Sequence, residues 1–216
     1  MPNRATRGVV NPNAIADASA HVNPRKSGVM GNAFVRAWRR ARTAGIYAPF
    51  VAETHVSFEE VPPHPEVMRA RLVAARDAMP WIVCEREGRV AGFAYASAHR
   101  SRAAYRYSVD TSAYVREADR GTGVGRAIYG ALLRVLTTQR FANAFAGIAL
   151  PNDASVGLHR ALGFEEIGRY ANVGFKDGAW RDTVWFQRPL ATRAIPPLEP
   201  LALSALAPET VVLALT

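Results

Sequence analysis

The chain has 216 residues, 49% of them hydrophobic and 21% charged, which is typical of a folded globular protein that buries a substantial core. The formal net charge is +9, but residues 1–52 hold eight basic side chains and one acidic one, or 8 − 1 = +7, which leaves 9 − 7 = +2 for the rest. We therefore expect no nucleic-acid partner for the body of the protein, and the basic segment alone is weak evidence for any anionic partner.

Cysteine content and hydropathy indicate the compartment. Cys84 is the only cysteine, so no internal disulfide can form, which fits a reducing compartment. No apolar run approaches the ~20 residues that span a bilayer, and the first 30 residues lack the apolar stretch of a secretory signal. We expect a cytoplasmic protein that makes no contact with membranes.

The first part of the chain predicts an extension, a strand and two helices. Residues 1–32 are rich in Asn, Ala, Pro and Gly without a period, and we expect them to be disordered and outside the core. Residues 33–38 read as a strand and residues 41–50 as a short helix. After the break at Pro62-Pro63, apolar residues at helical spacing predict a helix over residues 66–78.

The pattern then changes to that of strands. Residues 81–85 and 90–97 are apolar and β-prone on either side of Gly88, which predicts a hairpin. The later elements are an alternating strand over 105–116, a helix over 124–138, a strand over 144–150, a helix over 152–162 and a closing hairpin of 164–173 and 180–188. This order predicts one α/β (α+β) domain over residues 33–190, with helices on the faces of a single sheet. Residues 191–216 form a Pro-containing apolar tail that is either disordered or packed across a partner subunit.

A glycine-rich loop carries the strongest chemical signal. Residues 120–125 read Arg-Gly-Thr-Gly-Val-Gly and lie between a predicted strand and a predicted helix. Glycines let the backbone approach a ligand closely, and the free N–H groups of the first helical turn form an anion site that suits a pyrophosphate. Arg120 and Arg126 add positive charge. The alternative is a tight turn without a ligand; a nucleotide P-loop is excluded because no Gly-Lys-Ser/Thr ends the loop.

At this point the sequence resembles a known family. Residues 120–125 have the Arg/Gln-x-x-Gly-x-Gly/Ala form of the coenzyme A pyrophosphate loop in GNAT acetyltransferases. A second match comprises Asn152-Asp153-Ala154-Ser155, Leu158-His159 and Leu162-Gly163-Phe164. Further segments are similar to phosphinothricin and methionine sulfoximine N-acetyltransferases, namely Pro80-Trp81-Ile82-Val83, Arg102-Ala103-Ala104-Tyr105, Ser112-Ala113-Tyr114-Val115 and residues 174–182. The resemblance runs from about residue 45 to residue 190, and residues 33–44 match poorly.

The resemblance implies a fold and an activity. The fold would be the GNAT fold, a single mixed, mostly antiparallel twisted sheet of about seven strands flanked by about four helices. The activity would be transfer of the acetyl group of acetyl-CoA, without a metal, to the amine of a small amino-acid-like substrate by direct attack in a ternary complex. A homodimer is implied as well. The cofactor-binding residues would be Ala113, Tyr114, Val115, Arg120, Gly121, Thr122, Gly123, Val124, Gly125, Arg126 and Asn152.

Two residues are candidates for proton transfer. Asp110 lies in mid-strand, where the family has Glu, and we predict that it is the base, acting directly or through a bridging water because its side chain is one methylene shorter. The alternative is a structural ion pair with Arg106 or Arg102. The resemblance implies that His159 protonates the leaving thiolate, and an imidazole can donate a proton near neutral pH. Without the resemblance, a packed core histidine is the more ordinary interpretation.

An arginine cluster precedes Asp110 and predicts a site for a substrate carboxylate. Arg100, Arg102 and Arg106 can bind a carboxylate in bidentate fashion, and in an alternating strand Arg106 would share a face with Asp110. The resemblance adds Tyr105 and Phe58 to the substrate site. The alternative for each arginine is a solvated basic loop.

Competing functions follow from the same residues. A GNAT enzyme can act on another amine, such as a peptide N-terminus, a polyamine or an aminoglycoside, although the arginine cluster argues against the last. A different class is a non-catalytic coenzyme A-binding module whose basic N-terminal arm contacts nucleic acid.

Overall fold

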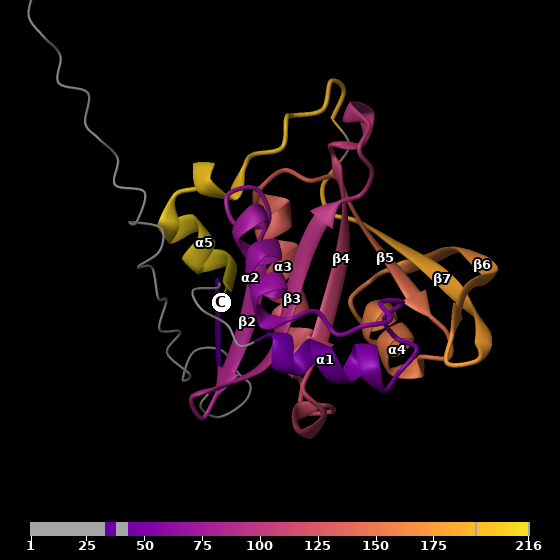
Figure 1. Ribbon diagram of the computed structural model, residues 1–216. Helices are drawn as coiled ribbons and strands as arrows, with labels where there is room; N and C mark the ends of the chain where they lie inside the picture. The colour runs from indigo at the N-terminus through magenta and orange to yellow at the C-terminus, as the bar shows by residue number, and fades with distance from the viewer. Residues whose placement is uncertain (1–32, 38–42, 193, 216) are drawn as a thin grey trace, which may run out of the picture.

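The computed structural model describes residues 33–37, 43–192 and 194–215, and of residues 33–37 it gives the backbone alone. The predicted extension over residues 1–32 lies outside the described residues. A single seven-stranded sheet has the order β1-β2-β3-β4-β5-β7-β6, and all neighbouring pairs are antiparallel except β4 with β5 (Figure 1). Its strands are β1 (Ala33–Ala37), β2 (Trp81–Arg86), β3 (Arg89–Ala98), β4 (Ser108–Val115), β5 (Asn143–Ala149), β6 (Glu165–Lys176) and β7 (Ala179–Pro189). The mixed, mostly antiparallel sheet predicted from the sequence is confirmed.

Helices cover both faces of this sheet. They are α1 (Ala44–Ala52), α2 (Pro65–Ala75), α3 (Val124–Thr138), α4 (Asp153–Ala161) and α5 (Pro208–Leu215). The alternation of β2 explains the two layers: Trp81 and Val83 pack with α1 and α2, whereas Ile82 and Cys84 pack with α3 and α5. Figure 1 shows α1 and α2 in front of the sheet and α3 behind it. Cys84 is fully buried, as expected of a core residue.

The strands β4 and β5 separate part of the way along the sheet. They are paired in register only from Ser108 with Asn143 to Asp110 with Phe145, although β4 continues to Val115. Beyond that point β5 keeps its full pairing with β7, and it leans away from β4 in Figure 1. The result is a wedge-shaped gap between β4 and β5 whose vertex is the rung of Asp110 and Phe145.

The strand predicted over residues 105–116 begins later than expected. Residues 103–105 form a 3₁₀ turn, and β4 starts at Ser108. Arg106 therefore belongs to the turn, and the alternation that was expected to place it beside Asp110 does not reach it. A turn fits this stretch because no residue of it is buried, so no core contact holds it in a strand.

The C-terminal segment packs on its own chain. Leu206, Val211, Ala214 and Leu215 are buried in the same core as α3. The Gln139 side chain donates to the carbonyl of Leu201 at 2.9 Å. The alternative of a disordered tail does not fit these described residues. No helix among the described residues is long and apolar enough to cross a membrane.

Candidate active site

Backbone groups of β4 face the gap. The N–H of Arg116 donates to the carbonyl of Ala91 in β3 at 2.8 Å, and backbone groups alternate along a strand, so even-numbered residues turn theirs toward β3. Ala113 and Val115 therefore turn their N–H and C=O groups toward the gap. Tyr114, which was expected to do the same, pairs its backbone with β3 instead. The two odd-numbered residues are the ones that can hydrogen-bond a ligand lying between the strands.

The glycine loop lies at the N-terminus of α3, after the end of β4. Gly121 and Gly123 have φ angles of 71° and 85°, which L side chains rarely adopt. Gly123 is the N-cap of α3 and supplies no side chain to the free N–H groups of the first turn. Those N–H groups are left for a ligand, and the helix dipole favours an anion there.

The buried carboxylate of Asp119 holds this loop in shape. This carboxylate accepts a hydrogen bond from Nε of Arg116 at 2.7 Å. The backbone carbonyl of Asp119 accepts a hydrogen bond from the Thr122 hydroxyl at 2.6 Å. Arg86 donates to the same hydroxyl at 3.0 Å. Thr122 is thus tied to the protein, while Arg126 is exposed at the helix start. Arg120 lies over the ring of Phe50, 4.9 Å from the ring centroid.

Asn152 begins α4 on the other side of the gap. Its Oδ1 accepts from the N–H of Ser155 at 3.1 Å, so it is the N-cap of the helix. No described residue hydrogen-bonds its Nδ2, which leaves a donor for a ligand amide. The capping and the ligand-binding roles are therefore compatible.

Asp110 lies at the vertex of the gap, and its partners differ from those predicted. Its Oδ1 lies 2.7 Å from Nδ1 of His99, and its Oδ2 lies 3.8 Å from Nη1 of Arg100. Burial raises the pKa of Asp110, against the opposing effects of His99 and Arg100. The carboxylate is not bound to Arg106 or Arg102, so the ion pair proposed as its structural alternative is wrong in both partners.

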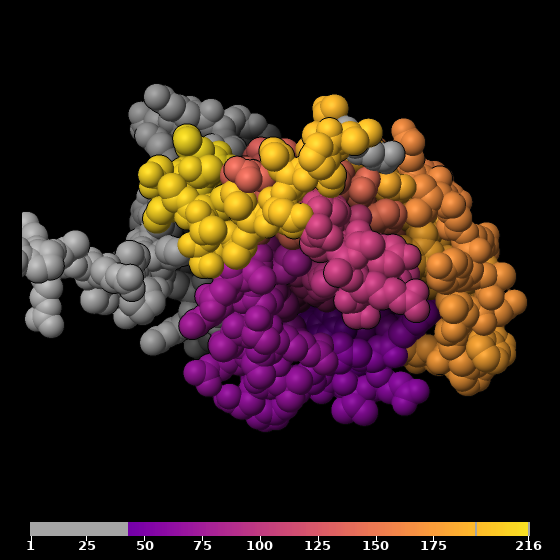
Figure 2. Space-filling model, turned by 90° about the horizontal axis from the view of Figure 1, so that it is seen from above, coloured from indigo at the N-terminus to yellow at the C-terminus, as the bar shows by residue number. Residues whose placement is uncertain are grey.

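Arg106 is engaged elsewhere. Its guanidinium donates to both carboxylate oxygens of Glu199, at 2.8 and 2.7 Å, and Tyr107 donates to the same carboxylate at 2.8 Å. Figure 2 shows the yellow C-terminal segment lying beside the magenta loop. Arg106 therefore holds the C-terminal segment and is not available for a substrate carboxylate, because the turn before β4 directs it away from the gap. Arg102 and Tyr105 are exposed in that turn. Arg100, which comes just before the turn, is exposed as well.

His159 is buried and both of its ring nitrogens have partners. Nδ1 lies 2.7 Å from the carbonyl of Ser155, and Nε2 lies 2.9 Å from the hydroxyl of Tyr129. Burial lowers the pKa of His159, and the hydrogen bond to Ser155 opposes that effect. A neutral ring with an N–H bound to a carbonyl has no proton to give a thiolate. The geometry thus favours the packed core histidine over the direct acid.

The same hydrogen bonds continue from His159 to the vertex of the gap. The hydroxyl of Tyr129 lies 2.6 Å from that of Thr111, which donates to the carbonyl of Phe145 at 2.9 Å. This series of hydrogen bonds links α4, α3, β4 and β5. It fixes the end of the paired rung, where the two strands begin to separate.

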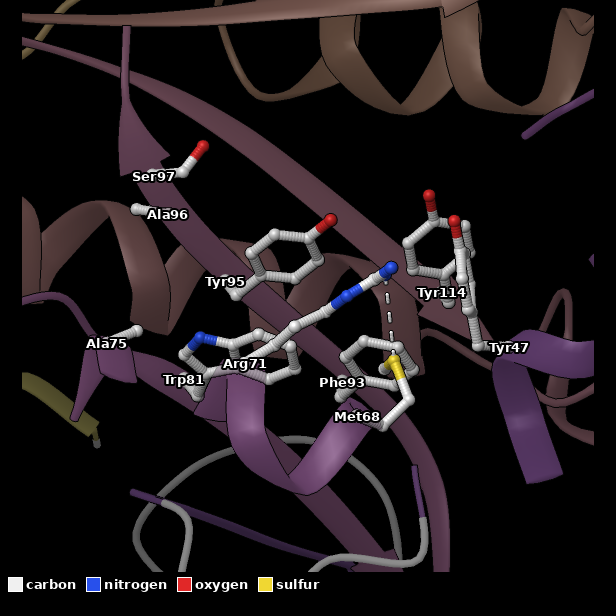
Figure 3. Close-up of a pocket in the computed structure, with 10 residues that line it drawn as sticks. All are labelled: Tyr47, Met68, Arg71, Ala75, Trp81, Phe93, Tyr95, Ala96, Ser97 and Tyr114. Carbon is white, nitrogen blue, oxygen red and sulfur yellow. Dashed lines mark hydrogen bonds between the residues drawn. The ribbon is translucent and has the colours of Figure 1, made fainter. Parts of the chain in front are cut away.

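An aromatic pocket lies next to Asp110 on the face covered by α1 and α2 (Figure 3). Ser97, which lies opposite Asp110 in the sheet, forms one end of it. The other lining residues are Tyr47, Met68, Arg71, Ala75, Trp81, Phe93, Tyr95, Ala96 and Tyr114. The Nε1–H of Trp81 is buried without a hydrogen-bond partner among the described residues. The pocket is thus mainly apolar, and the guanidinium of Arg71 is the charged group in its lining.

Phe58 lies at the edge of the site and packs against the hairpin of β6 and β7. A Cβ on Gly174 would come within 2.4 Å of the Phe58 ring. Phe58 is 43% exposed, so part of the residue remains open to solvent. Its expected place in a substrate site is compatible with this position.

Sequence reasoning missed several of these residues. His99 carried no signal beyond a lone histidine after a strand, and Tyr129 and Thr111 read as ordinary helix and strand residues. Only the register of the sheet brings them to the vertex. Among the described residues, no group of three or more His, Cys, Asp or Glu side chains could hold a metal ion.

Comparisons with known proteins match this geometry. Residues 45–185 match the model of the acetyltransferase (GNAT) domain. The chain is 43% identical over 147 residues to the phosphinothricin N-acetyltransferase of Alcaligenes faecalis, covering 67% of this chain and 75% of that protein. It is 36% identical over 154 residues to the L-methionine sulfoximine/L-methionine sulfone acetyltransferase of Pseudomonas paraeruginosa, covering 70% and 90%. A crystal structure of a phosphinothricin acetyltransferase from Sinorhizobium meliloti in complex with AcCoA superposes with a TM-score of 0.74 at 36% identity, covering 82% and 98%.

The matched segment contains the features described above. It includes the separated strands, the glycine loop, Asp110 and Asn152. A backbone gap that ends in an anion site is a suitable shape for a long thioester with a pyrophosphate at its far end. The chain belongs to the GNAT acetyltransferases and is an acetyl-CoA-dependent N-acetyltransferase.

Proposed function

We propose that this enzyme acetylates the amine of a small amino-acid-like substrate of the phosphinothricin or methionine sulfoximine type, by direct attack in a ternary complex. The observation that carries the proposal is the position of Asp110 at the vertex of the gap, beside both the aromatic pocket and Arg100. The names of the relatives support this substrate class over a peptide N-terminus or a polyamine.

The cofactor would lie along the gap. The N–H groups at the start of α3, with Gly121, Gly123 and the adjacent arginines, would bind its pyrophosphate. Ala113 and Val115 would hydrogen-bond the pantetheine arm from β4, and Asn152 would do so from α4. This arrangement presents the thioester carbonyl at the rung of Asp110, and one of the unpaired N–H groups of β4 would stabilise the charge that develops on its oxygen.

The substrate would lie on the other side of Asp110. Its carboxylate would pair with Arg100 and Arg102, and its side chain would enter the aromatic pocket. Both phosphinothricin and methionine sulfoximine have a short apolar stem that ends in an oxygen acceptor. The largely apolar lining of the pocket suits the stem of such a group.

In this proposal the negative charge of Asp110 favours loss of a proton from the substrate ammonium. The freed amine then attacks the thioester carbon, a C–N bond forms, and the C–S bond breaks with its electron pair going to sulfur. His159 acts through Tyr129 and Thr111 by holding the vertex in position, since neither of its nitrogens is free. The released thiolate takes its proton from the attacking nitrogen or from water.

The decisive experiment mixes the purified protein with acetyl-CoA and a panel of amines and follows release of free thiol. The panel holds phosphinothricin, methionine sulfoximine, natural amino acids, a short peptide and a polyamine. Turnover on the first two that is lost in Asp110→Asn would support the proposal. A preference for the peptide or the polyamine, or acetyl-CoA binding with no turnover at all, would refute the substrate class.

The pocket can be tested separately with Ala75→Leu. The added atoms project into the pocket and should raise KM for the amine by about tenfold, with the Kd for acetyl-CoA unchanged. Ala74→Leu, one position away and exposed on α2, is the matched control. An equal effect of both variants would remove the pocket from the substrate site.

We also propose a cytoplasmic homodimer. Five large apolar side chains are at least half exposed on the hairpin that ends the sheet, namely Ile167, Tyr170, Val173, Phe175 and Trp180. The outer strand β6 has a free edge in the described structure. Light scattering should give twice the mass of the chain, and Tyr170→Glu should reduce it to that of a monomer.

A further inference from the structure

His99 lies over the vertex of the gap. It directly follows β3, and its N–H lies 3.4 Å from the carbonyl of Ser108 across the sheet. Its ring stacks on that of Phe145, with a centroid separation of 4.3 Å and an angle of 17°. The imidazole therefore covers the rung at which β4 and β5 stop pairing.

The hydrogen bond to Asp110 defines which nitrogen of His99 carries the proton. Nδ1 lies 2.7 Å from the carboxylate, which can only accept when ionised, so Nδ1 is the N–H of the neutral ring. Nε2 then carries the lone pair. No described residue hydrogen-bonds Nε2, and the side chain keeps 12% of its area exposed.

Asp110 is not well suited to take a proton directly from an ammonium. The carboxylate is short, and its Oδ1 already faces an imidazole. An imidazole changes its charge near neutral pH, and a carboxylate behind it fixes the tautomer and stabilises the charged ring. The arrangement of an exposed nitrogen, a bound nitrogen and a carboxylate is that of a general base with its orienting partner.

We propose that Nε2 of His99 is the atom that accepts the proton of the substrate ammonium, and that Asp110 orients the ring and stabilises the imidazolium. This inference rests on the proposed function and assigns its base. One proton moves from the ammonium to Nε2 and then to solvent. The amine forms the C–N bond, the C–S bond breaks, and the second proton lost by nitrogen ends on the coenzyme A sulfur, so atoms and charges balance.

Among the residues that the structure describes, few other charges face the ring. Asp110 and Arg100 are the charged groups beside it, and the phenol of Tyr105 has its ring centroid 5.9 Å away. From β5 and β7 the contacts are Phe145 and Trp185, which do not titrate. Protonation of Nε2 at low pH should therefore remove the base and give activity an acidic limb.

The test measures kcat/KM against pH for the wild type, His99→Gln and Asp110→Asn. Glutamine can still hydrogen-bond Asp110 but cannot take a proton, so kcat should fall by about 10²- to 10⁴-fold, and the acidic limb should disappear. His99→Phe keeps the stacking on Phe145 and should show the same loss. Acetyl-CoA binding should stay within twofold in each variant, which confirms that the fold is intact.

Two outcomes would overturn the inference. The first is a His99→Gln variant whose kcat lies within threefold of the wild-type value and whose pH profile keeps the acidic limb. That result would assign the role of base to Asp110. The second comes from ring nitrogen NMR of the wild type, where we expect the neutral Nδ1–H tautomer of His99, held by the hydrogen bond to Asp110. An Nε2–H tautomer would contradict the inference even if the enzyme is active. If the wild type acetylates no amine in the panel, that result refutes the proposed function alone. The tautomer seen in the spectrum then still tests the role of His99.

Discussion

The ammonium of Lys176 donates a 2.6 Å hydrogen bond to the backbone carbonyl of Ser57, although 119 residues separate the two in sequence. The same ammonium donates to the carbonyls of Val51 at 2.7 Å and Glu59 at 2.8 Å. A buried lysine at the tip of the β6–β7 hairpin thus holds the loop between α1 and α2. That loop carries Phe58, so the hairpin helps to position a residue that the resemblance places in the substrate site.

Lys176→Met should release this loop. The substitution removes the donor of three hydrogen bonds and leaves their carbonyls buried, which should lower the free energy of unfolding by about 3 kcal/mol. KM for the amine should rise more than tenfold, while the Kd for acetyl-CoA stays the same because none of the three carbonyls belongs to the glycine loop. Urea denaturation and steady-state kinetics measure the two effects. Asp177→Asn, at the exposed neighbouring position, is the control; an equal rise in its KM would contradict the role of the ammonium.

Gly174→Ala should displace the Phe58 ring. The new Cβ would meet ring atoms at 2.4 to 2.9 Å, closer than any normal contact. Because the ring is the partly exposed end of a side chain, it can swing outward, and stability should change by less than about 1 kcal/mol. KM for the amine should rise severalfold. Gly168→Ala meets nothing within 4 Å and should leave KM unchanged. If Gly174→Ala binds substrate normally, Phe58 is not part of the site.

Gly123→Ala should weaken cofactor binding. The φ angle of 85° is strained for alanine, by about 1–2 kcal/mol, and relief of that strain would turn the N–H groups of the first turn of α3 away from the anion. The Kd for acetyl-CoA, measured by calorimetry, should rise about tenfold. Gly45→Ala, where a Cβ meets nothing within 4 Å, should leave it unchanged. Normal binding by Gly123→Ala would show that the pyrophosphate lies elsewhere.

The C-terminal segment should loosen in acid through Glu199. Hydrogen bonds from Arg106, and then from Tyr107, lower the pKa of this carboxyl from 4.5 to about 2. Because the pKa of Glu199 is lower in the folded state, its ionised carboxylate stabilises the fold fully at pH values above the ordinary pKa of 4.5. This stabilisation is lost as the pH falls from 4.5 toward about 2. The urea midpoint of the wild type should therefore approach that of Glu199→Gln over this range. Arg106→Gln should reduce the difference to the part that the Tyr107 hydroxyl supplies, and an undiminished difference would contradict the pairing.

Much of the fold followed from local sequence. Val124 to Thr138 has helical spacing after a glycine loop, residues 81–98 have the strand–turn–strand pattern, and Asn152 caps its helix, because each of these depends on neighbours a few residues apart. The loop and the Asn152 motif also identified the family. Asp110 was found in the same way, as a carboxylate in the middle of a strand.

The partners of those residues were decided only by tertiary structure. Arg106 was expected beside Asp110 and instead binds Glu199, since a turn before β4 breaks the alternation. His99 reaches Asp110 because β3 and β4 are antiparallel neighbours, and no local pattern reports that register.

Burial likewise could not be read from residue type. His159 resembles a catalytic histidine in sequence, but the packing of α4 against α3 encloses it and occupies both nitrogens. Sequence by itself determined the elements, the anion loop and the family, because these depend on short-range spacing. The strand register and the packing of the two faces decided which side chains meet at the vertex, because those contacts join residues far apart in the chain.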